Sequence, residues 1–111
     1  MSLSSDMKDG VQIVRVGAPR IDAAGAIQFK EAMRAETANG DGRVILDLSA
    51  VDFIDSSGLG AIVAAMKQLD GDRRLDLASL SPTVDKVFRL TRMDTVFRLY
   101  PTLDDALAVA E

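Results

Sequence analysis

The sequence predicts a single α/β domain over residues 1–111, with a mostly parallel sheet of four to five strands and about four helices. Three observations support this class. Short runs rich in Val, Ile and Leu alternate with segments of helical spacing, in the order β-α-β-α-β-α-β-α. Turn residues (Gly, Pro, Asn and Asp) separate the segments. The length suits one ordinary domain, and such alternation is typical of parallel strands joined by right-handed crossovers.

The amino-terminal part of the chain predicts one strand and one helix. Residues 1–8 are weakly patterned and fit either an edge strand or a loose arm, followed by the tight turn Asp9-Gly10. The β-branched run Val11–Val16 predicts a strand. Asp22 is expected to cap a helix over residues 23–38, because its carboxylate can accept a hydrogen bond from a free N–H of the first turn.

The central part predicts the most buried strand and a second helix. The stop signal Asn39–Gly42 ends the first helix, and the apolar run Val44–Leu48 follows it directly, as expected of a strand buried on both faces. Either Asp55 or Ser56 can cap the next helix, which is expected over residues 57–70.

The carboxy-terminal part repeats the alternation. The run Leu75–Leu80 predicts a strand, and Ser81 is expected to cap a third helix that starts with Pro82. Val96–Tyr100 predicts the last strand, and Thr102 opens a final helix through a capping box. The inward positions of this helix are expected at Leu103, Ala106, Leu107 and Ala110.

The composition excludes several classes of function. The chain has no histidine and no cysteine, so it lacks the commonest general base and any Ser-His or Cys-His pair. Its net charge is −4 and its 13 Lys and Arg are scattered, which argues against nucleic-acid binding. No apolar run approaches the roughly 20 residues of a membrane span, and no signal-peptide pattern opens the chain. We therefore expect a cytoplasmic binding protein without membrane insertion, cofactor, metal or catalytic residue.

The predicted second helix carries the most informative pattern. Five residues recur at helical spacing and predict one buried stripe, namely Leu59, Ile62, Val63, Met66 and Leu69. Small or polar residues are expected on the opposite face, namely Ser57, Ala61, Ala64 and Gln68, with Gly60 at its border. Such a face would let a partner's backbone approach closely. The alternative interpretation is that Gly58 and Gly60 only ease a tight loop against the sheet.

A serine at the start of a helix can have two roles. It can be a plain cap, or it can be a phosphorylation site whose added charge of about −1.5 to −2 the helix dipole tolerates. Phosphorylation here would place a dianion beside Asp55, and a partner fitted to a neutral hydroxyl would be repelled. Local physics does not choose between Ser56 and Ser57, although Ser57 lies on the face opposite the apolar stripe.

The segments Val44–Ser49 (VILDLS) and Asp52–Gly60 (DFIDSSGLG) resemble the signature of STAS domains in the anti-sigma-factor antagonist family. The similarity extends across most of the chain and includes Ile21–Ala24, Leu80–Pro82 and Leu90–Phe97. One departure is the stretch Gly17–Arg20, where the family usually has a shorter, glycine-centred turn.

The resemblance implies a switch between partners. In this family the unphosphorylated protein binds an anti-sigma factor that is also a serine kinase, and this binding frees the sigma factor. The kinase phosphorylates the second serine of the motif, which matches Ser57, and a metal-dependent serine phosphatase reverses the modification. The family's partner-facing aspartates match Asp22 and Asp55. The two aspartates, the serine pair and the small residues of the second helix together form the expected partner-binding set, namely Asp22, Asp55, Ser56, Ser57, Gly58, Gly60, Ala61 and Ala64.

Two other functions are compatible with parts of the sequence. A STAS subunit of another assembly, such as a signalling scaffold or the cytosolic part of a lipid transporter, would share the fold without sigma-factor control. The serine pair followed by Gly-Leu-Gly favours the antagonist. An enzyme that relies on carboxylates is disfavoured by the missing histidine. A magnesium site at Asp47, Asp52 and Asp55 is disfavoured because Asp47 lies in a predicted strand.

Overall fold

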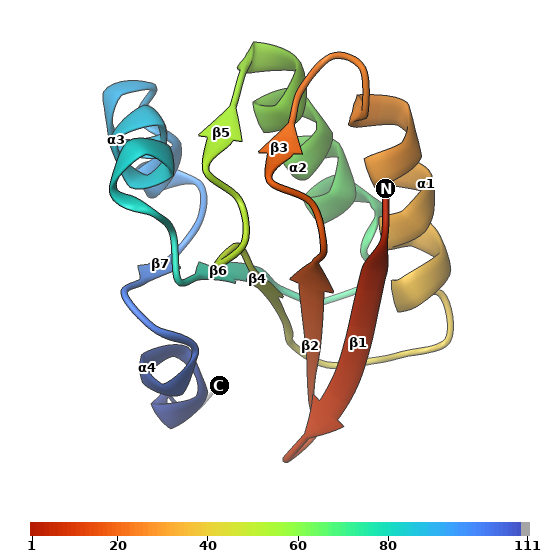
Figure 1. Ribbon diagram of the computed structural model, residues 1–111. Coiled ribbons are helices and arrows are strands. Elements are labelled where there is room, and N and C mark those ends of the chain that lie inside the picture. The colour runs from red at the N-terminus through yellow and green to blue at the C-terminus, as the bar shows by residue number, and fades with distance from the viewer. Residues whose placement is uncertain (110–111) are drawn as a thin grey trace.

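A five-stranded sheet in the order β1-β2-β4-β6-β7 forms the centre of the computed structural model, which describes residues 1–109 (Figure 1). Its strands are β1 (Leu3–Lys8), β2 (Val11–Val16), β4 (Val44–Asp47), β6 (Leu75–Ala78) and β7 (Leu99–Tyr100). β1 runs antiparallel to β2, and the other neighbouring pairs are parallel. The predicted α/β class and mostly parallel sheet are therefore confirmed.

The first strand decides between the two interpretations of residues 1–8. β1 is an edge strand in which Leu3 pairs with Val16 and Lys8 pairs with Val11. The connection to β2 is the tight turn Asp9-Gly10, and both of its residues have positive φ, at 53° and 80°. This geometry is typical of the two-residue hairpin turns whose twist matches the flanking strands.

Two short strands outside the main sheet were not predicted. β3 (Arg20–Ile21) and β5 (Phe53–Ile54) pair in parallel, with Ile21 opposite Ile54. Figure 1 shows them side by side, each leading into the start of a helix. Two residues are too few for a periodic pattern, so the sequence carries no strand signal here. This small sheet brings the loops before the first two helices together.

The helices cover both faces of the main sheet. They are α1 (Ala26–Thr37), α2 (Ser56–Gln68), α3 (Pro82–Leu90) and α4 (Leu103–Ala108). The first three enclose the main core with Val14, Val44 and Leu46, whereas α4 packs on the other face against Ile45 and Ala78. The predicted caps of α3 and α4 are confirmed, because Ser81 accepts from Val84 N–H and Thr102 accepts from Asp105 N–H. Ala110 lies outside the described residues.

Two predicted boundaries are wrong. Asp22 does not cap α1, because β3 extends the chain through Ile21 and α1 begins only at Ala26, with Gly25 at the N-cap position. The last strand is shorter than Val96–Tyr100. A 3₁₀ turn forms at Met93–Thr95, and the N–H groups of Val96 and Phe97 bond back to the carbonyl of Met93.

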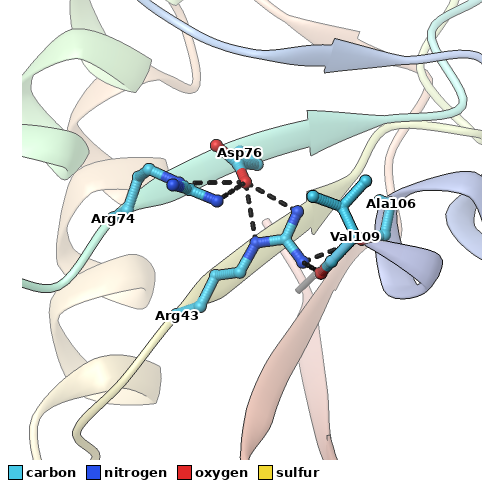
Figure 2. A network of polar contacts seen from close by, with 5 residues as sticks. All are labelled: Arg43, Arg74, Asp76, Ala106 and Val109. Carbon is cyan, nitrogen blue, oxygen red and sulfur yellow. Dashed lines mark hydrogen bonds and ion pairs between the residues drawn. The ribbon is translucent and has the colours of Figure 1, made fainter. Parts of the chain in front are cut away.

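A buried ion network fastens α4 to the sheet (Figure 2). Arg43, which directly precedes β4, places Nε and Nη2 each 2.7 Å from Oδ2 of Asp76 in β6. Arg74 reaches the same oxygen from the partly exposed side, at 3.1 Å. The remaining nitrogen of Arg43, Nη1, donates to the carbonyls of Ala106 and Val109 at the end of α4. Arg43 therefore acts as a cationic cap for that helix.

Candidate functional site

The loops before α1 and α2 meet at the side chain of Asp55. Asp55 is the N-cap of α2, in extended conformation, and its Oδ1 accepts the N–H of Gly58 at 2.9 Å. Its Oδ2 accepts the N–H of Ala23 at 3.2 Å. Of the two predicted caps, Asp55 rather than Ser56 fills the role. One carboxylate thus satisfies a free N–H of the helix start and also ties down the neighbouring loop.

Gly58 allows the two segments to approach this closely. A Cβ atom added at Gly58 would overlap the carbonyl oxygen of Ile21 and would lie 2.8 Å from Cγ1 of Ile54. Gly58 is buried, which favours the alternative interpretation that it eases close packing of the loop. Its lack of a side chain serves packing inside the molecule. Gly60 differs, because a Cβ added there would have no atom within 4 Å.

The exposed face of α2 is narrower than predicted. Ser56, Ser57 and Gly60 are exposed and Ala64 is half-buried. Ala61 is only 2% exposed, so its expected place on the open face is wrong. The buried face consists of Gly58, Ala61, Ile62 and Ala65. Of the predicted stripe, Ile62 is therefore buried as expected, and the other four residues are half-buried, namely Leu59, Val63, Met66 and Leu69. Small residues let this helix sit close to the strands, although they contribute little to a hydrophobic pattern.

Asp22 lies at the edge of the same surface, beside an arginine that the sequence analysis did not single out. Arg20 Nε lies 3.1 Å from Asp22 Oδ2, and this hydrogen bond holds the pKa of the Asp22 carboxyl below its usual range. The N–H groups of Gly25 and Ala24 act in the same direction, while partial burial opposes them. The Arg20 guanidinium also lies 3.9 Å above the ring of Phe53. Arg20 therefore connects Asp22 on one loop to β5, which precedes the other.

The site offers hydroxyl groups but few other reactive groups. Ser56 and Ser57 lie in the first turn of α2, where N–H groups lack helical partners. Neither hydroxyl forms a hydrogen bond with another residue among 1–109. Within the same range, no three acidic side chains come together as a metal site would require. Asp47, considered for magnesium, instead accepts the N–H of Ser49 at 3.0 Å.

Two further properties of the described residues concern membrane-spanning helices and exposed apolar side chains. None of the helices described for residues 1–109 has the length and apolar character needed to cross a membrane. Ile27, in the first turn of α1 directly after the Asp22 loop, is 67% exposed. Nothing in the sequence pattern separates this outward isoleucine from a core residue.

Comparison with known proteins connects this geometry to one family. The family model described as the STAS domain matches residues 3–106. The anti-sigma-F factor antagonist RsfB of Mycobacterium tuberculosis is 29% identical over 99 residues, which cover 89% of this chain and 80% of the relative. The crystal structure of an anti-sigma factor antagonist from Mycobacterium paratuberculosis matches with a TM-score of 0.85 and 34% identity, covering 96% of this chain and 91% of the other.

A further match shows how widely the fold is used. The murine anion transporter Slc26a9 contains a region that matches with a TM-score of 0.79 and 20% identity. The match covers 93% of this chain but only 18% of the transporter. At this identity the likeness shows the fold alone, so the function must be argued from the site.

Proposed function

Because the chain belongs to the STAS domain family, we propose that it is an anti-sigma-factor antagonist. In its unphosphorylated state it binds an anti-sigma factor that is also a serine kinase, and it thereby releases the sigma factor. The names of the two mycobacterial relatives and the coverage of nearly the whole chain support this proposal. In this role the chain is a regulatory binding protein and not an enzyme.

The switch is phosphorylation of Ser57, and the observation that carries it is the exposed hydroxyl at the start of α2. A kinase can reach this group without unfolding the chain. The added dianion would lie next to the carboxylate of Asp55 and on the same surface as Asp22. A partner that fits the neutral surface would then meet repulsion and a desolvation cost. A metal-dependent serine phosphatase restores the binding form.

The docking surface consists of exposed or half-buried residues around Ser57. It comprises Asp22, Ser56, Ser57, Gly60 and Ala64. Gly58 and Ala61 support this surface from beneath and do not touch the partner. Asp55 uses both carboxylate oxygens within the chain, so its contribution to docking needs a separate explanation.

A labelling experiment tests the proposal. The purified chain is incubated with ATP and the kinase encoded beside its gene, and phosphate is located by mass spectrometry. We expect one phosphate at Ser57, no labelling in Ser57→Ala, and normal labelling in the matched control Ser56→Ala. Labelling that persists in Ser57→Ala would reject the site. If no kinase and sigma-factor gene pair exists and the chain instead copurifies with a transporter or scaffold, the alternative assembly is correct.

A further inference from the structure

We infer that Asp55 is a latch that holds the Asp22 loop (residues 22–25) in place, and that it acts on docking through this loop and not by touching the partner. The inference rests on the proposed function for the identity of what docks. The latch itself is a property of the free chain. The two bonds that define it join Asp55 Oδ1 to Gly58 N–H at 2.9 Å and Asp55 Oδ2 to Ala23 N–H at 3.2 Å.

The other direct hydrogen bonds between these segments involve the chain only as far as Ile21. The N–H of Asp55 donates to the Ile21 carbonyl at 3.4 Å, and Ile21 pairs with Ile54 in the small sheet. The close contact under Gly58 also involves Ile21. Beyond Ile21 the chain leaves the strand and turns toward α1, and Ala23 is the point at which this turn is tied to the start of α2. The Asp55–Ala23 bond therefore ties the loop directly to the start of α2, whereas Arg20 links Asp22 of the same loop to Phe53 in β5.

The residue type at position 55 fits a latch better than a simple cap. A helix cap needs one acceptor, and Ser, Thr, Asn and Asp supply it about equally well. The two N–H groups reach different oxygens of the side chain, so both of its branches must be acceptors. A carboxylate meets this requirement, whereas a carboxamide has an NH₂ donor on one branch and a hydroxyl has a single oxygen. Asp55 Oδ1 and Oδ2 each have one such donor. Contacts within the free chain therefore account for an aspartate at this position, without a cationic partner.

Asp55→Asn separates the latch from the cap in the free chain. An asparagine that keeps its carbonyl oxygen on Gly58 turns its NH₂ group toward Ala23, so it cannot accept the Ala23 N–H. We expect amide hydrogen exchange, measured by NMR, to become about fivefold faster or more at Ala23, as for the loss of one hydrogen bond. Exchange at Gly58 should change much less. Asp52→Asn is the matched control, since it removes an exposed charge from the same edge, and it should leave both amides unchanged.

Three outcomes would overturn the latch. Unchanged exchange at Ala23 in Asp55→Asn would show that the bond does not hold the loop. Equal acceleration at Ala23 and Gly58 would show that Asp55 only maintains the fold. The third concerns the proposed kinase: Asp55→Asn should weaken its binding while the salt dependence of binding stays that of the parent chain. If the salt dependence falls in this variant, Asp55 contacts a charge on the partner directly, and the latch is rejected. Failure of any kinase to label Ser57 in the parent chain would reject the proposed function but leave the exchange result standing.

Discussion

Gly58 lies against the carbonyl oxygen of Ile21, and there is no room between them for a Cβ atom on residue 58. This contact sets how closely α2 approaches the small sheet of β3 and β5. It also places the exposed Ser57 beside the loop that carries Asp22. The surface proposed for docking is thus assembled from two distant segments by one buried glycine and one bridging carboxylate.

The first prediction concerns the two glycines of α2. Gly58→Ala should lower the free energy of unfolding by about 2–3 kcal/mol, because the new Cβ overlaps the Ile21 carbonyl and presses on Ile54. Gly60→Ala should raise it by about 0.5–1 kcal/mol, because alanine favours a helix and space is open there. Urea unfolding followed by circular dichroism measures both. A Gly58→Ala chain as stable as the parent would contradict the packing described here.

The second prediction tests whether a partner passes close to Gly60. Gly60→Leu should fold normally, since the position is open to solvent, and should bind the proposed kinase at least about tenfold more weakly if the partner packs against this face. Lys67→Leu introduces the same side chain at an exposed position in the last turn of α2. It should leave binding unchanged. Equal affinity for both variants would remove Gly60 from the docking surface.

The third prediction separates charge from size at the proposed switch. Ser57→Glu should keep the melting temperature of the parent, because the side chain is exposed and lies at the favourable end of the helix dipole. It should weaken kinase binding by about tenfold or more through like-charge repulsion. Ser57→Gln has nearly the same size without the charge and should bind more tightly than Ser57→Glu. If both variants bind alike, the block is steric.

Much of the fold could be predicted because its signals are local. Val11–Val16 and Val44–Leu48 were recognised from their own composition, and the caps Ser81 and Thr102 bond only three residues ahead. The strands β3 and β5 were missed because each is two residues long and exists only through the other. A pairing between distant segments leaves no periodic trace in either one.

The candidate site was predicted only in part, because some of its features are local and others depend on distant contacts. The start of α2 at Asp55 and Ser56 followed from local capping. Ala61 was placed on the wrong face because a hydrophobic pattern gives weight to large residues, whereas this helix packs through small ones. The bond from Asp55 to Ala23 spans 32 residues, and nothing near either residue predicts it.

The fourth prediction uses the ionisation of Asp22. Its pKa lies below the ordinary value of 3.8, chiefly because Arg20 donates a hydrogen bond to it. A carboxyl whose pKa is lower in the folded than in the unfolded chain stabilises the fold at pH values above the unfolded-state pKa. This stabilisation is lost as the pH falls through the folded-state pKa. An NMR titration of the Asp22 carboxyl carbon should show the depressed pKa. Arg20→Gln should raise that pKa toward 3.8, and an unchanged titration would contradict the pairing.

The last prediction concerns Arg43, whose contacts the sequence did not reveal because Asp76 and Ala106 lie 33 and 63 residues further on. Arg43→Met should lower the free energy of unfolding by about 3–5 kcal/mol, because it leaves the Asp76 carboxylate buried without its main counter-charge. Arg89→Met is the control at the surface: it breaks the exposed pair with Asp85 and should lower the free energy of unfolding by less than about 1 kcal/mol.

A double variant shows which part of the Arg43 network matters. Arg43→Met with Asp76→Leu removes both buried charges, and Arg74, which is partly exposed, can turn its guanidinium toward water. Replacement of a buried ion pair by apolar residues is often neutral, so most of the stability lost in the single variant should return. The carbonyls of Ala106 and Val109 remain without their donor. If amide exchange in the double variant is faster than in the parent only within α4, Arg43 holds this helix independently of its pairing with Asp76. If exchange in α4 changes no more than in the rest of the chain, Arg43 does not hold the helix separately.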